Sequence, residues 1–392
     1  MKRLPRPLLV AALLAALAAV LPAQIRPGEK CTVCGHDAEI MAATGVSHGP
    51  FIFARSDSET IEQEYFWRPV WVETPHFRMG LMIEKWKVPE EERKDYRAEL
   101  EQLQEIYPRI KPKSRILDPW LRAHLIAWRL ENFYAMWAKL MGAREGQFDD
   151  PEALRMLGMG PYLGESDKYE VMVFRNRAPY REFMSRTWGL TYVKPQRWNN
   201  IDRDCLWFGM NMEEEGVRHD KHLFAMILHN IGLNMLNGYL HYSYEMPIWI
   251  KEGAAHWCSR QFDPRFNTFD TVEGSFHEAK SLTRWEPEVR KLVQKDRAAS
   301  FASLMRRASF AELDFNDHLI VWSKVDFLIR HDPEKFGRFI TFLKSRRDER
   351  GLPDGSNMDD AQRQAFREIY GWTIQKAEEA WREFVLSEYP VK

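Results

Sequence analysis

The stretch 221–258 constrains the fold of this chain more than any other. Its first half, 221–237, is apolar on almost every side, and a helix of that kind is buried in a core. Asn237 and Gly238 form a stop signal for this helix, and Pro247 is well placed in the first turn of the next one. We therefore expect two consecutive buried helices joined by a short loop.

Few polar side chains interrupt these two helices. The first carries His229, Asn230 and Asn234. The second carries Glu252 and, one turn later on the same face, His256. His229 could be a core histidine bonded to a carbonyl or a metal ligand. A buried carboxylate must be paired or hydrogen-bonded, so Glu252 needs a partner, for which Lys251, Arg260 or a nearby histidine would serve.

The order of these residues resembles that of the gluzincin zinc metallopeptidases, and most closely the secreted bacterial peptidase MA-like group. That family has His-Glu-x-x-His on one helix and, about eighteen residues later, a glutamate in the context W-x-x-E-G-x-A. Here His229 begins the window and Glu252 follows Trp249 in the matching context. The resemblance covers roughly residues 66–390 and is specific only over 221–260.

Two departures from that pattern decide the expected chemistry. Asn230 stands in the position of the general base, and Leu233 stands in the position of the second zinc histidine. An amide has no useful basicity, and a leucine cannot bind a metal. The resemblance therefore implies an exported pseudoprotease, with zinc absent or weakly bound at the degenerate site.

A rearranged metal site is the alternative. His256 occupies a position where relatives have an acid that supports the first zinc histidine, and a histidine there could bind the metal itself. His229, Glu252 and His256 would then be the ligands of an active metal-dependent hydrolase or peptidase. By the same resemblance, His318 stands in the position of a tyrosine that donates to the oxyanion.

The expected partner follows from the same comparison. Gluzincins hold an extended peptide against the edge strand of their sheet, so a pseudoprotease would bind an extended polypeptide or a component of the cell envelope. A second alternative is a glycan-binding or structural envelope protein, since the chain has fifteen tryptophans and sugar-binding surfaces use aromatic rings. With 56 basic and 57 acidic residues, the charge balance does not favour nucleic acid.

The amino terminus predicts export. Three basic residues precede the apolar run 8–21, and Leu21-Pro22-Ala23 is a plausible cleavage site, so 1–23 reads as a signal peptide. No later stretch is long and apolar enough to span a bilayer, and we expect no transmembrane segment in the mature chain. The predicted location is periplasmic or extracellular.

The four cysteines leave several alternatives. Cys31 and Cys34 form a Cys-x-x-Cys-Gly motif, which fits a local disulfide, a free pair or a zinc knuckle. A knuckle needs two more ligands, and His36 or His48 could supply only one of them. Cys205 and Cys258 flank the candidate site in sequence, and a disulfide between them is a further hypothesis.

The elements expected along the chain predict an α+β fold that is predominantly helical. After the signal peptide we expect a cysteine-containing segment at 24–65, an α/β subdomain with a small sheet at 66–215 and a helical subdomain at 216–392. The expected strands are 51–54, 71–78, 169–174 and 205–210. The expected helices are 90–106, 117–141, one near 179, the buried pair, and then 274–294, 301–311, 317–330, 333–346 and 359–388.

Overall fold

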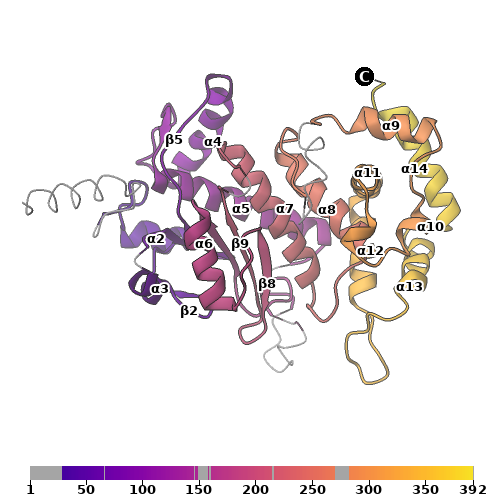
Figure 1. Cartoon of the computed structure of the whole chain (residues 1–392), viewed down its shortest axis with the longest axis horizontal. Coiled ribbons are helices and arrows are strands. Elements are labelled where there is room, and N and C mark those ends of the chain that lie inside the picture. Colours follow the sequence, from indigo (N-terminus) through magenta and orange to yellow (C-terminus); the bar gives the residue numbers. More distant parts are fainter. Residues whose placement is uncertain are drawn as a thin grey trace, which may run out of the picture.

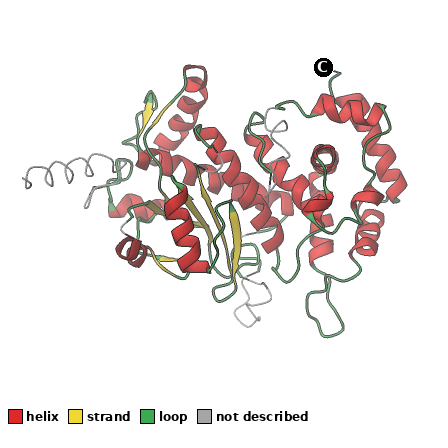
Figure 2. Cartoon of the chain, in the orientation of Figure 1, coloured by secondary structure: helices red, strands yellow, loops and turns green. Residues whose placement is uncertain are grey.

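The computed structural model describes residues 29–65, 67–144, 146–148, 158, 160–213, 216–269 and 282–391. It has a mixed five-stranded sheet in the amino-terminal half and a helical carboxy-terminal half, which confirms the predicted α+β class (Figure 2). The predicted signal peptide, 1–23, lies outside the described residues. Within them, no helix combines the length and the apolarity needed to cross a bilayer.

The central sheet has the strand order β3-β4-β7-β9-β8. Its three inner strands run parallel, and each edge strand runs antiparallel to its neighbour. The bounds are Val70–Glu73 for β3, Phe77–Leu81 for β4, Tyr169–Phe174 for β7, Gln196–Asn200 for β8 and Cys205–Asn211 for β9.

Two strands differ from the prediction. The expected strand 71–78 is a hairpin, because Pro75 cannot donate to a ladder and the chain turns there, with Thr74 N donating to Phe77 O at 2.8 Å. Strand β8 was not expected at all. Its sequence, Gln-Arg-Trp-Asn-Asn, is mostly polar because the strand lies at the edge of the sheet and is only partly buried.

Helices cover both faces of the sheet (Figure 1). Alternate side chains of β7, such as Val171 and Val173, face a core shared with α5 (Pro119–Met141) and α7 (Asp220–Gly238). Met172 and Phe174 face a second core on the other side, shared with α6 (Arg177–Phe183) and with α3 (Ser58–Tyr65). Helix α7 therefore lies against the sheet, as the all-round apolar sequence of that helix requires.

The start of α7 is fixed to α5 by a buried ion pair. Asp220 accepts hydrogen bonds from Arg122 at 2.8 Å and from the hydroxyl of Tyr96 at 2.9 Å, and Arg129 lies 3.5 Å away. Burial opposes ionisation of this carboxyl, but the two guanidinium charges outweigh it and hold the pKa of Asp220 below its ordinary value. The helix that carries His229 is thus held at its first turn by three side chains.

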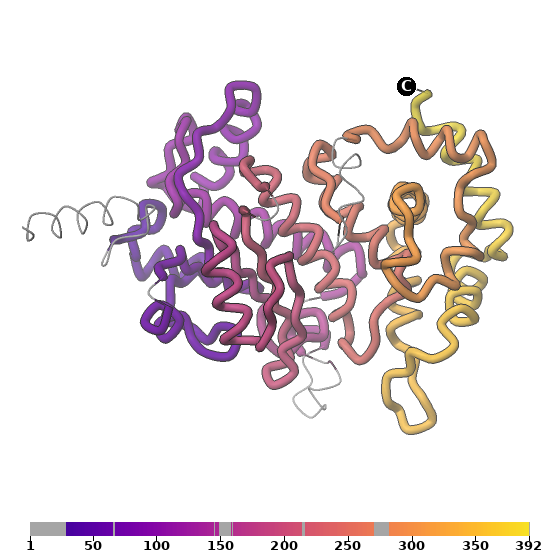
Figure 3. The backbone as a smooth tube through the Cα atoms, in the orientation of Figure 1, coloured from indigo at the N-terminus to yellow at the C-terminus, as the bar shows by residue number. Residues whose placement is uncertain are grey.

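The carboxy-terminal helices surround α11, which is seen almost end-on in Figure 1 and can be followed as a tube in Figure 3. Their bounds are Ile248–Phe262 for α8, Glu286–Gln294 for α9, Phe301–Leu304 for α10, Phe315–His331 for α11, Pro333–Lys344 for α12, Met358–Ala365 for α13 and Ile374–Glu388 for α14.

Some of these helices are shorter than expected. The predicted helix 359–388 is divided, because a π-helical turn at Phe366–Tyr370 leads into Gly371, whose φ of +73° ends the helix. The predicted helix 301–311 ends at Leu304, and residues 274–281 of the predicted helix 274–294 lie outside the described part.

The remaining elements lie in the amino-terminal half, and all of them are short except the charged helix α4. They are α2 (Ala38–Thr44), β1 (Ile52–Phe53), β2 (Ser56–Asp57), β5 (Trp86–Lys87), α4 (Arg93–Ile106) and β6 (Ile116–Leu117). The expected strand 51–54 is thus a two-residue strand in a small hairpin.

Candidate functional site

Helices α7, α8 and α11 approach one another closely because two glycines leave space between them. A Cβ atom on Gly232 of α7 would lie 2.8 Å from the sulfur of Cys258 on α8. A Cβ on Gly253 of α8 would lie 2.5 Å from the carbonyl oxygen of Val321 on α11. Contacts that short would force a neighbouring atom to move, so glycine at both positions allows the observed close approach of the helices.

Three side chains meet between α8 and α11. Glu252 and His256 come from α8 and His318 comes from α11, and one ligand atom of each lies within 4.8 Å of the others. His256 Nε2 and His318 Nδ1 share a hydrogen bond of 2.9 Å, and His318 Nδ1 lies 3.9 Å from Glu252 Oε2. We call these three residues the buried histidine group. Its donors, one carboxylate and two imidazoles, are those that zinc takes in catalytic sites.

The ligand set predicted from the sequence differs from this group in one residue. His229 of α7 is beside it, with its ring centroid 5.2 Å from that of His256, but His229 does not belong to the group of converging ligand atoms. His318 takes that place, whereas the resemblance had given it the role of an oxyanion donor. The sequence offers no signal for this exchange, since 62 residues separate His256 from His318.

The surroundings of His256 favour its neutral ring. Burial lowers the pKa of His256 well below its ordinary value, and the neighbouring His318 and His229 lower it further. The neutral ring has one nitrogen with a free electron pair. In the bond between His256 and His318 one ring donates and the other accepts, and a cation between them would take both electron pairs.

The residues expected to neutralise Glu252 by simple pairing are engaged elsewhere. Lys251 forms an ion pair with Glu245, and Arg260 donates to the side-chain oxygen of Asn267 at 2.8 Å. His318, the histidine that the structure brings toward this carboxylate, has its Nδ1 3.9 Å from Glu252 Oε2.

Asn230, in the position of the general base, has both ends of its amide occupied by protein. Its oxygen accepts a hydrogen bond from Arg197 of β8 at 2.7 Å, and its nitrogen donates to the carbonyl of Met226 at 3.0 Å. Asn230 therefore connects α7 to the edge strand. The amide has no basicity, and these bonds give it a structural partner on each side.

The site is closed to solvent. His229, Asn230, Glu252, His256 and His318 have exposed fractions of at most 2%. Leu233 is completely buried and adds to the core at the position of the second zinc histidine. Phe269 lies over the group, with its ring centroid 5.3 Å from each of the rings of His256 and His318.

None of the four cysteines, all of which are described, takes part in a disulfide. The predicted disulfide between Cys205 and Cys258 is not formed, because Cys205 lies in strand β9 while Cys258 packs against Gly232 on α7. Cys31 and Cys34 are not bridged either. They converge with His48 and His124, and the four ligand atoms lie within 4.8 Å of one another. The structure thus holds a second group of metal-ligand type.

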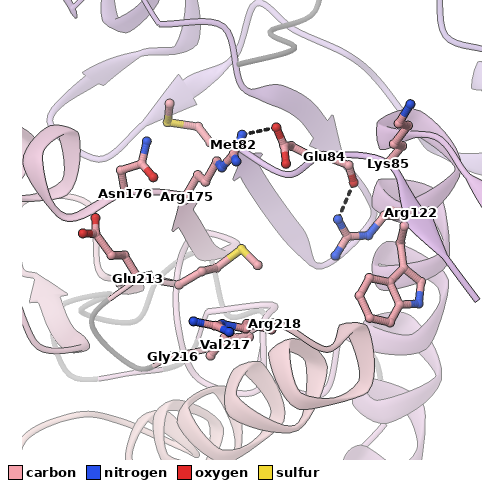
Figure 4. A pocket seen from close by; sticks show the side chains of 12 residues that line it. Met82, Glu84, Lys85, Arg122, Arg175, Asn176, Glu213, Gly216, Val217 and Arg218 are labelled. Atoms are coloured by element: carbon pink, nitrogen blue, oxygen red, sulfur yellow. Dashed lines mark hydrogen bonds and ion pairs between the residues drawn. The ribbon is translucent and has the colours of Figure 1, made fainter. Parts of the chain in front are cut away.

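A cavity of about 480 Å³ lies elsewhere, at the carboxyl ends of the parallel strands (Figure 4). Met82, Arg175 and Met212, which directly follow β4, β7 and β9, line it. Arg175 forms an ion pair with Glu84 within its wall. No residue of the buried histidine group lines this cavity, so it does not open the group to solvent.

Comparison with known proteins adds no relative to these observations. No model of a known protein family matches the chain, and a search of curated proteins finds no match.

Proposed function

We propose that this chain is an exported, non-peptidolytic relative of the gluzincin metallopeptidases that binds extended polypeptide along the edge of its sheet. The observation that carries the proposal is the state of the base position. Asn230 is held by Arg197 and by the carbonyl of Met226, in a site whose side chains are shielded from water. A peptidase needs a group there that removes a proton from water, and this amide cannot.

Zinc in the arrangement of the gluzincins does not fit these residues. That arrangement needs an imidazole one turn after His229, where the buried Leu233 stands. The family's own ligand set is therefore incomplete in this chain.

The binding role rests on strand β8. Among the described strands, β8 has β9 as its single neighbour, so it ends the sheet and offers its outer backbone groups to an added strand. Arg197 joins this strand to Asn230 on α7. An extended polypeptide paired with β8 would lie beside the degenerate helix, as a substrate does in the enzymes that the sequence resembles.

Binding and cleavage of labelled, unfolded casein by the purified protein test the proposal. We expect binding without cleavage, with or without added zinc. Hydrogen exchange at 196–200 should slow when casein is added, while the loop 346–356, which follows α12 in the helical half, serves as internal control (Figure 1). No binding, or protection only away from β8, would contradict the binding role.

Two proline variants make the test specific to the strand edge. Along an edge strand, successive backbone N–H groups alternate between the neighbouring strand and the open side. Trp198→Pro and Asn199→Pro therefore remove one N–H on the β9 side and one on the open side. The variant that stays folded should bind casein more weakly than wild type. Unchanged binding in that variant would place the polypeptide elsewhere.

A metal-dependent hydrolase is the second candidate, and the buried histidine group is the observation that favours it. Glu252, His256 and His318 would hold the ion, and the ion would act as a Lewis acid there. Casein cleavage that requires added zinc and is lost in both Glu252→Gln and His318→Gln would establish this activity and overturn the first proposal. His229→Gln serves as control, since His229 does not belong to the group.

The fifteen tryptophans, which suggested the glycan-binding alternative, are mainly core residues. None of the fifteen tryptophans, all of which are described, is fully exposed, and most are buried in the two cores.

A further inference from the structure

The amino-terminal segment contains a group of four side chains that the proposed function does not use. Cys31 and Cys34 lie in the turn before α2, His48 lies in the loop after it, and His124 lies on α5. His124 Nε2 is 3.2 Å from Cys31 Sγ, and His48 Nε2 is 3.1 Å from Cys34 Sγ. Two sulfurs and two imidazole nitrogens thus converge from three separate parts of the chain.

The backbone around the cysteines is folded to present both sulfurs to one point. The N–H groups of Val33 and Cys34 point at the sulfur of Cys31, at 3.3 and 3.5 Å. Gly35 N donates to the carbonyl of Cys31 at 2.9 Å, and the φ of +67° at Gly35 closes the turn. A sulfur that binds a metal can also accept such N–H groups, so the geometry of this turn suits a ligand.

His48 is oriented so that its Nε2 faces the sulfur of Cys34. Its Nδ1 lies 2.8 Å from the carbonyl oxygen of Trp71, and because a carbonyl only accepts, Nδ1 carries the hydrogen. Nε2, with its electron pair, is then directed at Cys34. Ser47 keeps the loop in place, since its backbone exchanges two hydrogen bonds with Glu73 of β3.

His124 is held from the helix side. It lies in the second turn of α5, which Asp118 caps by accepting from two backbone N–H groups. Thr32, between the two cysteines, donates its hydroxyl to the carboxylate of Asp118, which ties the cysteine turn to the start of the same helix. The ring of Tyr107 packs edge-on against His124 at 4.8 Å.

The spacing of the four atoms suits a tetrahedral ion. Zinc with bonds of about 2.3 Å to sulfur and about 2.0–2.1 Å to nitrogen separates a sulfur from a nitrogen by about 3.5 Å. The separations of 3.2 Å between Cys31 and His124 and 3.1 Å between Cys34 and His48 need only a small outward movement of the side chains.

We propose that Cys31, Cys34, His48 and His124 form a structural zinc site that joins the amino-terminal segment to β3 and α5. The four protein ligands fill a tetrahedral shell, and Cys31, Cys34 and His124 are buried, so no position is left for a substrate or a reactive water. The ion would keep both thiols reduced in an oxidising compartment, where a free Cys-x-x-Cys pair forms a disulfide. This proposal does not depend on the function proposed above.

Metal analysis of the full-length protein, purified without chelators, tests the site. We expect about one tightly bound zinc ion per chain, and a loss of about tenfold or more in metal content in Cys34→Ser and in His124→Ala. Cys205→Ser and Cys258→Ser are matched controls, because they remove buried cysteines outside the group and should keep the metal. Zinc that persists in Cys34→Ser would overturn the assignment.

Cobalt substitution separates this site from the buried histidine group, which contains no sulfur. We expect a thiolate-to-cobalt absorption band in wild type and in His256→Gln, and none in Cys34→Ser. His48→Cys keeps four ligands, so it should retain the ion and strengthen the band even if other variants fold poorly. A Cys31–Cys34 disulfide in the purified protein, seen as a mass lower by two hydrogens and accompanied by no metal, would refute the proposal.

Discussion

Replacement of Gly253 by alanine tests the contact between α8 and α11 on which the buried histidine group depends. The added Cβ would lie 2.5 Å from the carbonyl oxygen of Val321 and 2.5 Å from a methyl carbon of Val325. An ordinary contact begins near 3.4 Å, so α11 would have to move by about 1 Å.

Two effects of opposite sign determine the size of the change. In the middle of a helix, alanine is more favourable than glycine by about 1 kcal/mol. Overpacking of a core costs about 1–3 kcal/mol, and a clash with a backbone atom belongs at the upper end because a carbonyl has no other rotamer to adopt. We therefore expect Gly253→Ala to destabilise the protein by about 1–2 kcal/mol in net terms.

Gly232→Ala provides the matched comparison, because its added Cβ meets a side chain instead of backbone. It would lie 2.8 Å from the sulfur of Cys258, and Cys258→Ala removes that atom. Together the two changes should cost less than the sum of their separate effects, with a coupling of about 1 kcal/mol. Val325→Ala should relieve Gly253→Ala much less, since the clash with the carbonyl of Val321 remains.

Urea unfolding of the four single variants and the two double variants, followed by tryptophan fluorescence, measures these differences. A neutral or stabilising effect of Gly253→Ala would contradict this reasoning. Helix propensity alone would then be acting, and α11 would not be close enough to α8 to place His318 beside His256 and Glu252.

Three further predictions concern other parts of the structure. Asp220→Asn should destabilise the protein by about 3–5 kcal/mol at pH 7, because Arg122 and Arg129 lose a buried counter-charge. The folded-state pKa of Asp220 is lowered, so its carboxylate stabilises the fold above the ordinary pKa near 4, and this contribution is lost as the pH falls further. The free energies of urea unfolding of wild type and variant should therefore converge in acid. An equal difference at every pH would contradict the pairing. Asn230→Glu combined with Leu233→His should add one zinc ion to the chain. The metal content is measured in a Cys34→Ser background, which lacks the proposed structural zinc. A triple variant that folds but binds no metal would show that α7 and α8 do not have gluzincin geometry. Removal of zinc from wild type by a chelator should lower the thermal midpoint and speed proteolysis within 29–57, whereas Cys34→Ser should show no further change with chelator.

Local sequence patterns were sufficient for the helix pair and for the class of the fold. A helix that is apolar on almost every side, as 221–237 is, needs neighbours on all sides to be shielded from water. In the structure, α7 lies between the sheet and α8. The stop at Gly238 and the start after Pro247 were predicted for the same reason, since caps and breakers act within one turn of a helix. The proximity of His229 to the second helix also follows from that pair.

The partners within each group of ligands could not be predicted in the same way. His124 occupies one position of an apolar helix, and its apolar neighbours give no sign that it faces two cysteines that lie 90 and 93 residues earlier. The resemblance to gluzincins points to His318, but as an oxyanion donor and not as a metal ligand. Strand β8 was missed because its polar side chains do not alternate with apolar ones.

The sequence by itself determined what could not act as a base or a ligand, because the identity of Asn230 and Leu233 settles that wherever they lie. It also determined which helices are buried, since the hydrophobic period is a local property. Only the tertiary structure decided which side chains meet. Convergence of ligand atoms depends on how closely helices from distant parts of the chain approach one another. A single Cβ atom can change that approach, and its absence at Gly253 allows α8 and α11 to lie close together.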